Sequence, residues 1–149
     1  MRIQIENLTK RFQDTLVLDH VNLDIRQREF LGLLGPSGSG KTTLLRIIAG
    51  LDFAGEGVVK FDGEDIGTLP LQQRQVGFVF QQYALFAHMR VVDNVAFGLK
   101  VRPRRRRPAR AEIGRRVNEL LDLVQLSGFG DRFPAQLSGG QRQRVALAR

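Results

Sequence analysis

Hydrophobic and polar residues alternate in three short stretches of the chain, which predicts half-buried β-strands. Ile3 and Ile5 alternate with polar neighbours over residues 2–6, and the same pattern recurs over residues 21–26 and 59–61. Asp62-Gly63 follows the third stretch and is a turn signal. Strands with one polar face are typical of antiparallel sheets. We therefore expect an antiparallel β subdomain in the first part of the chain.

Two further runs are apolar throughout, at residues 30–34 and 76–80. Continuous apolar runs of this length are typical of strands that are buried on both faces of a parallel sheet. A helix is predicted directly after the first run, over residues 42–49. Parallel strands that alternate with helices indicate an α/β fold.

The second half of the chain has a helical pattern. Apolar residues recur at the spacing of one helix face, at Ile113, Val117, Leu120, Leu121 and Val124, whereas charged and polar residues occupy the opposite face. We predict one α/β domain over residues 1–149. Residues 1–84 would hold the β subdomain and the parallel core, and residues 85–149 a helical subdomain.

A glycine-rich loop lies between the first apolar run and the predicted helix at residues 42–49. It reads Gly35-Pro36-Ser37-Gly38-Ser39-Gly40-Lys41-Thr42 and continues with Thr43. This spacing is the phosphate-loop pattern, in which backbone N–H groups at a helix N-terminus cradle phosphates. Lys41 is expected to reach the β- and γ-phosphates of a nucleotide, and Thr42 to hold Mg²⁺. The alternative is a turn that binds nothing.

Two other polar groups follow predicted elements. Gln81 comes directly after the apolar run 76–80, at the strand end where α/β sheets bind ligands, and it could bind Mg²⁺ or position a water. Ser138-Gly139-Gly140-Gln141 follows Leu137 and precedes a predicted helix, so Ser138 is expected to cap a second anion-binding N-terminus.

Composition narrows the possible functions. The chain has 149 residues and no cysteine, which excludes disulfides and thiolate catalysis. Its net charge is +8, and much of the excess lies in six arginines between residues 102 and 110. Such charge raises the question of nucleic acid. The arginines lie around Pro103 and Pro108 without aromatic residues, so we interpret them as a solvated connection.

These motifs, in this order, resemble the ATP-binding subunits of ABC transporters over the whole chain. Gly35–Thr42 resembles the Walker A loop, Gln81 the Q-loop glutamine, and Leu137–Gln141 the signature motif. The resemblance implies that Phe12 stacks on adenine. It also implies a homodimer in which two subunits enclose ATP and Mg²⁺, with Ser138 acting in trans across the interface.

Within that family, residues 81–89 and 93–99 resemble the Q-loop region of importer ATPases. Residues 101–108 and 131–136 resemble the importer ATPases of the sulfate/thiosulfate type. The resemblance implies membrane permease subunits and a periplasmic sulfate- or thiosulfate-binding protein as partners. It places the protein at the cytoplasmic face of the inner membrane, and no nucleic acid is expected. Arg28 and Ala87 depart from residues common in relatives.

In the same family, the Walker B aspartate, the catalytic glutamate and the switch histidine follow the signature helix. We therefore expect them beyond Arg149, and we expect residues 1–149 alone to be inactive in ATP hydrolysis. Two alternatives remain at this point. One is a soluble ABC ATPase that acts on nucleic acid or ribosomes, and the other is a fragment that binds nucleotide without turnover.

Overall fold

The chain forms two compact units in a computed structural model that describes residues 1–67, 69, 73–74 and 76–149. The first unit is Met1–Phe78 and the second is Val79–Arg149. Each unit has its own hydrophobic core, and the units are described separately below. The division predicted after residue 84 stays a prediction.

The first unit contains a four-stranded antiparallel sheet. Its strands are β1 (Ile3–Phe12), β2 (Thr15–Ile25), β3 (Glu56–Phe61) and β4 (Glu64–Asp65), in the order β2-β1-β3-β4. Ile5 pairs with Leu23 on one side and with Val59 on the other. Ile5 and Val59 are buried, as their alternation with polar residues predicts. The predicted antiparallel subdomain is confirmed.

The turn at Asp62-Gly63 joins β3 to β4. Both residues have positive φ, 50° and 90° respectively, as a two-residue hairpin turn of the primed type requires. Gly63 adopts this conformation without steric cost, whereas Asp62 is one of the residue types that tolerate it. The turn predicted from these two residues is confirmed.

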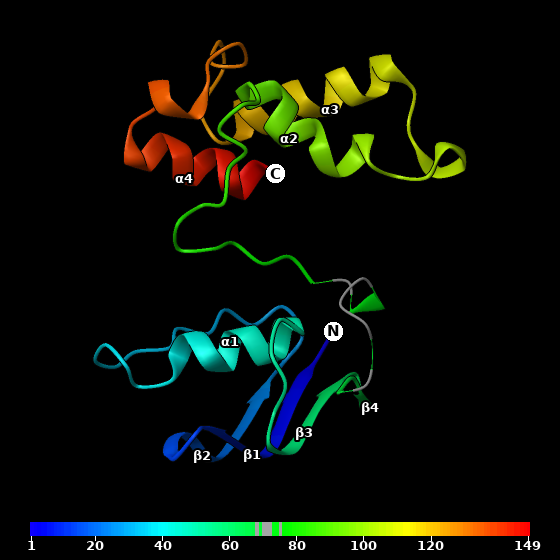
Figure 1. Ribbon diagram of the computed structural model, residues 1–149. Coiled ribbons are helices and arrows are strands. Elements are labelled where there is room, and N and C mark those ends of the chain that lie inside the picture. The colour runs from blue at the N-terminus through cyan, green and yellow to red at the C-terminus, as the bar shows by residue number, and fades with distance from the viewer. Residues whose placement is uncertain (68, 70–72, 75) are drawn as a thin grey trace. The chain divides into compact units, whose positions relative to one another are not determined.

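Helix α1 (Lys41–Ala49) packs its apolar side on this sheet. Leu44 and Ile47 of α1 join a buried cluster with Ile5, Leu8 and Val59. Figure 1 shows α1 lying across one face of the sheet formed by β1, β2 and β3. The sheet therefore fixes the direction in which the N-terminus of α1 points.

Arg74 binds the C-terminal end of α1. Its Nη1 donates to the carbonyl of Ile47 at 2.9 Å, and its Nε donates to the carbonyl of Leu69 at 3.2 Å. The side chain is only 5% exposed, and this burial lowers the pKa of the guanidinium. Gly50 leaves room for it, since a Cβ there would lie 2.6 Å from Arg74 Nε. The helix thus ends on a buried cation, which favours its negative dipole end.

The two continuous apolar runs do not form the predicted strands. Within the described chain, neither residues 30–34 nor residues 76–80 are assigned to a strand, and the sheet order includes neither. Apolar sequence predicts burial, but a strand also needs hydrogen-bonded neighbours and covered faces. Phe30 and Leu34 are instead 97% and 95% exposed. The prediction of parallel core strands is therefore wrong for this structure.

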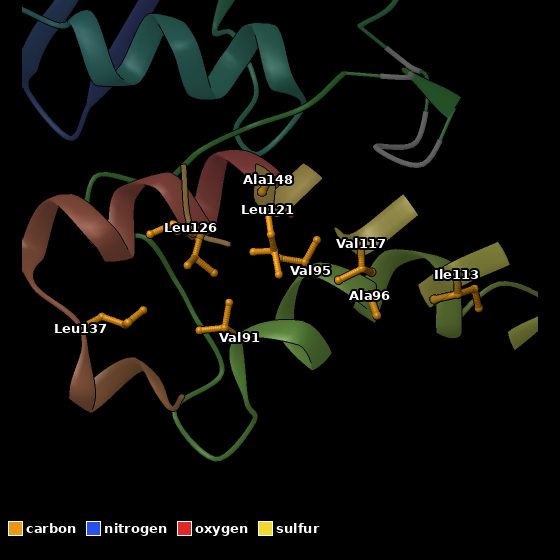
Figure 2. Close-up of a cluster of buried hydrophobic side chains, with 10 residues drawn as sticks. Val91, Val95, Ala96, Ile113, Val117, Leu121, Leu126, Leu137 and Ala148 are labelled. Atoms are coloured by element: carbon orange, nitrogen blue, oxygen red, sulfur yellow. The ribbon is translucent and has the colours of Figure 1, made fainter. Parts of the chain in front are cut away.

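The second unit is helical. It contains α2 (Val91–Lys100), η2 (Arg104–Arg106), α3 (Arg110–Leu123), η3 (Pro134–Gln136) and α4 (Gly139–Ala148). Ile113, Val117 and Leu121 of α3 are buried, as their spacing predicts. Figure 2 shows these side chains meeting Val91, Val95 and others in a shared core. Among the described residues, no helix is long and apolar enough to cross a membrane.

Asn94 is a buried polar residue that organises the loop before α2. Its side chain is 0% exposed and is fully hydrogen-bonded to the backbone. Oδ1 accepts from the N–H of Phe86 at 2.9 Å, and Nδ2 donates to the carbonyls of Phe86, Met89 and Arg90, each at 3.1 Å. One side chain therefore holds residues 86–90 against the first turn of α2.

Asn94→Ala should lower the free energy of unfolding of the helical unit by about 2–4 kcal/mol, because it leaves buried backbone groups without partners. Asn118→Ala is the matched control, since Asn118 lies on the exposed face of α3. Urea unfolding followed by circular dichroism at the helix band measures both variants. Equal losses in the two variants would contradict this role of Asn94.

Candidate functional site

The glycine-rich loop of residues 35–40 leads directly into α1. Gly35, Gly38 and Gly40 all have positive φ, at 152°, 82° and 84°. The loop is tight, and the N–H of Ser39 donates to the carbonyl of Pro36 at 3.3 Å. A succession of such residues turns backbone N–H groups toward one point, which is the arrangement that binds anions. Residues 35–39 are exposed, so this loop is open to a ligand.

Gly40 is required both by its backbone conformation and by its surroundings. A Cβ at this position would lie 2.7 Å from the carbonyl oxygen of Val17 and 2.8 Å from Leu18 Cδ2. Gly40 is also the N-cap of α1 and has a left-handed φ. Strand β2 therefore touches the backbone at the start of the helix, and only glycine fits this contact.

Lys41 is held inside its own loop. Its ammonium group donates to the carbonyls of Gly35 at 2.8 Å and Pro36 at 2.6 Å, and to Ser39 Oγ at 3.0 Å. These three acceptors place one positive charge within the ring formed by residues 35–41. A Cβ on Gly35 would crowd the same space, at 2.9 Å from Ser39 Oγ. The loop is thus a cradle of backbone groups that encloses one cation.

The N-terminus of α1 adds to this positive site. The helix has no side-chain N-cap and no acidic residue in its first turn. The first N–H groups of any α-helix lack intrahelical acceptors, and here no N-cap side chain accepts from them, so the helix dipole favours an anion there. Thr42 is exposed in this first turn, and Thr43 is half-buried beside it. The geometry suits a phosphate group.

A Mg²⁺ site at this position is compatible with the residues present. Within the described ranges, no three His, Asp or Glu side chains gather to hold a metal. Mg²⁺ commonly uses one or two protein oxygens together with phosphate oxygens and water. Thr42, exposed in the first turn of α1, supplies a hydroxyl of this kind. The site would depend on the nucleotide for its remaining ligands.

Phe12 is not a core residue of the first unit. It is 47% exposed at the end of β1, where it pairs with Thr15 at the start of β2. Val17, whose carbonyl meets Gly40, follows two residues later on β2, which is about 7 Å along the strand. The hairpin thus brings an exposed aromatic residue near the N-terminus of α1.

Lys10 is a residue of this region that the sequence analysis missed. Its Nζ lies 4.9 Å from the centroid of the Phe12 ring and donates to Asp52 Oδ1 at 2.8 Å. The hydrogen bond from Lys10 lowers the pKa of the Asp52 carboxyl. The two-residue spacing of Lys10 and Phe12 on one strand indicates a shared face and could have revealed the pair.

The remaining predicted site residues belong to the second unit. Gln81 is exposed in a turn, in which the N–H of Tyr83 donates to the carbonyl of Phe80 at 2.8 Å. Ser138 and Gln141 lie at the start of α4. The structure therefore groups Phe12 and residues 35–43 in one unit, and Gln81 and residues 138–141 in the other.

Ser138 and Gln141 form a reciprocal capping box. The N–H of Gln141 donates to Ser138 Oγ at 3.3 Å, and the N–H of Ser138 donates to Gln141 Oε1 at 2.8 Å. Ser138 is thus the N-cap of α4, as predicted. Gly139 and Gly140 have open space around them, because a Cβ on either would meet nothing within 4 Å. Packing within this unit therefore does not require glycine at these two positions.

Comparisons with known proteins all indicate the same family. Residues 18–149 match the ABC transporter family. Over all 149 residues the chain is 61% identical to the sulfate/thiosulfate import ATP-binding protein CysA 2 of Rhizobium meliloti, of which it covers 41%. It is 58% identical to CysA of Acinetobacter baylyi and covers 42% of that protein. The chain spans about two fifths of the length of these curated relatives.

Solved structures agree with this match. The chain is similar to the ATP-binding cassette MJ0796 in a dimeric post-hydrolysis state bound to ADP and Pi, with a TM-score of 0.86 and 36% identity. The alignment covers 98% of this chain and 67% of that one. A second dimeric structure of MJ0796, described as a bacterial ABC transporter cassette, gives the same TM-score with 37% identity. The predicted ABC ATPase fold is confirmed by these matches, although the predicted parallel core strands do not form in the described part of this chain. The chain belongs to the ABC transporter family as an ATP-binding domain.

Proposed function

We propose that the complete protein is the ATP-binding and ATP-hydrolysing subunit of an importer for sulfate or thiosulfate. The observation that carries this proposal is the identity of 61% over the whole chain with a sulfate/thiosulfate import ATP-binding protein. The phosphate cradle of residues 35–42 supplies the chemistry that such a subunit needs. The similarity extends past the motifs common to all ABC proteins, which favours this transport class over an ATPase that acts on nucleic acid or ribosomes.

Nucleotide binding begins at the cradle. The N–H groups of residues 35–40 and of the first turn of α1 would hold the phosphates, and Lys41 would exchange its contacts with Gly35 and Pro36 for phosphate oxygens. Bound Mg²⁺ would neutralise charge that develops on the phosphates during transfer. Thr42 and Gln81 would provide its protein ligands, and Gln81 could also orient the attacking water. Thr43 would support the phosphate beside Thr42.

The exposed Phe12 ring would bind the adenine. Its 47% exposure at the end of β1 supports this assignment and argues against an ordinary core role. A flat aromatic face stacks on any base, so this contact gives affinity with little discrimination among bases. Lys10 beside the ring would hold the Phe12 end of the hairpin through Asp52.

The second unit would act on the nucleotide of a partner subunit. Ser138, Gly139 and Gly140 form the start of α4, where N–H groups are available to an anion. The two glycines are not required by their own unit, which supports close approach by a ligand from outside. Both similar solved cassettes are dimers. We infer a homodimer in which Ser138–Gln141 of one subunit faces the phosphate loop of the other.

Membrane permease subunits and a periplasmic sulfate- or thiosulfate-binding protein complete the proposed importer. The ATP-binding subunit would sit peripherally at the cytoplasmic face of the inner membrane. Co-purification of the complete protein with permease subunits tests this assembly. Recovery of ribosomes or nucleic acid in their place would overturn the importer and favour the alternative.

Lys41→Ala should weaken MgATP binding to the complete protein at least tenfold, because it removes a charge-assisted contact of about 1.5–3 kcal/mol. Titration calorimetry measures the affinity. Lys60→Ala is the control, since Lys60 pairs with Glu6 on the sheet and lies outside the loop. If Lys41→Ala binds MgATP with unchanged affinity, the assignment of this loop as the phosphate site is contradicted.

Phe12→Ala should weaken ATP and GTP to similar extents, because a stacking surface is lost whichever base is bound. Phe12→Tyr should retain affinity, since the ring remains. Phe53→Ala removes another exposed aromatic of the same unit and should have no effect. Binding of both nucleotides that survives Phe12→Ala would show that the ring does not contact the base.

Ser138→Arg should leave ATP binding by the isolated subunit intact and abolish hydrolysis by the dimer. Ser127→Arg is the matched control, because it adds the same bulk to an exposed serine of the same unit. Mixing Ser138→Arg with Lys41→Ala subunits gives a dimer with one doubly defective site and one intact site. We expect phosphate release to return in part in this mixture. Normal turnover by Ser138→Arg alone would exclude the trans-acting role.

A further inference from the structure

Six arginines gather on the connection between α2 and α3, and the function proposed above does not use them. They are the exposed residues Arg102, Arg104, Arg105, Arg106, Arg107 and Arg110. No acidic residue occurs between Asp93 and Glu112, so the segment carries positive charge alone. Within the parts of the chain that the structure describes, none of the six pairs with an acid.

Cations on either side of this segment pair with acidic side chains, whereas the six arginines pair with none among the described residues. Lys100 pairs with Asp93 at 2.6 Å at the end of α2. On α3, Arg115 and Arg116 both bind Glu112, and they lower the pKa of that carboxyl to about 2. Acidic side chains thus neutralise these neighbouring cations, at i,i+3 and i,i+4 spacing in the case of Glu112. The six arginines keep their charges available to a partner.

Local hydrogen bonds hold the backbone of this segment in shape. Pro103 begins the short helix η2 and accepts from the N–H of Arg106 at 2.8 Å. Arg107 folds back, so that its Nε and Nη2 donate to the carbonyl of Arg102 at 3.3 and 3.2 Å. The helices on both sides share one core. The segment thus presents its charges on a short, anchored loop.

Arg110 lies at an electrostatically unfavourable position. It is the first residue of α3, where the helix dipole presents partial positive charge. Repulsion among the six like charges adds to this cost at low ionic strength. An external polyanion would relieve both effects.

We propose that this surface, residues 102–110, binds the anionic phospholipid headgroups of a bilayer. Guanidinium groups form paired hydrogen bonds with phosphate oxygens. Clusters of four to eight basic residues are typical of anionic-lipid binding. Val101, which is 58% exposed beside Arg102, offers an apolar contact at the same edge. The choice of a bilayer rests on the proposed function, because an importer subunit works beside a membrane.

Nucleic acid is the less favourable partner for this surface. Residues 101–111 contain no aromatic side chain on which a base could stack. Helix η2 has three residues, which is too short to read base edges from a groove. Contact with nucleic acid would be limited to the phosphates.

Co-sedimentation of the complete protein with lipid vesicles tests the proposal. One set of vesicles contains phosphatidylcholine alone, and the other contains about one third phosphatidylglycerol. The protein should bind only the anionic vesicles, and high salt should release it. Equal binding to both kinds of vesicle, or no binding, overturns the proposal.

Two triple variants that remove the same charge distinguish an effect of this local surface from an effect of the protein's net charge. Arg104→Gln, Arg105→Gln and Arg106→Gln together should lower vesicle partitioning about a hundredfold, since each basic residue contributes about fivefold. Arg11→Gln, Arg26→Gln and Arg28→Gln remove the same charge from exposed positions of the first unit and should have little effect. Equal losses in the two triple variants would overturn the local site.

Two further measurements distinguish lipid from nucleic acid as the partner, and lipid binding from ATP binding. Fluorescence anisotropy with a short single strand and a duplex measures binding of nucleic acid at the same salt. Tighter binding of an oligonucleotide than of anionic vesicles, if lost in the Arg104–Arg106 variant, overturns the lipid assignment. Lys41→Ala should bind vesicles normally, because lipid binding needs no ATP, and loss of vesicle binding in that variant would contradict a separate lipid surface.

Discussion

The contact between Gly40 and the carbonyl of Val17 is the constraint on which the phosphate site depends. It fixes the first turn of α1 against β2, so the direction of the helix N-terminus follows from the sheet. Arg74 holds the opposite end of the same helix through the carbonyl of Ile47. A helix held at both ends can keep its dipole aimed at one place when a ligand arrives and leaves. The cradle of residues 35–39 can then be exposed and still have a defined shape.

Sequence reasoning recovered the local features that depend on neighbouring residues. The alternation in β1, the turn at Asp62-Gly63, the buried stripe of α3 and the cap at Ser138 all have signals within a few positions. The glycine spacing in the phosphate loop is of the same kind, since positive φ and a helix start can be inferred together. The family assignment followed because several such motifs occur in one order.

The features that sequence reasoning missed depend on long-range contacts. Residues 30–34 and 76–80 are as apolar as buried strands, yet strand formation depends on neighbours that no local pattern specifies. The burial of Arg74 requires the space left by Gly50, which lies 24 residues earlier. Asn94 looks like an ordinary polar helix residue in the sequence. Its role appears only when the backbone of residues 86–90 folds over it. The pairing of Lys10 with Asp52 is a further contact of this kind.

The hydrogen bonds around Asn94 also have a mechanical consequence. They make the loop of residues 86–90 a stiff extension of α2, and the N–H groups of Val91 and Val92 are in turn bonded to the carbonyls of Arg132 and Gly130. The chain passes from Arg132 through η3 to Ser138 within a few residues. Hydrogen bonds and a short stretch of chain therefore connect residues 86–90 with the start of α4 within the helical unit.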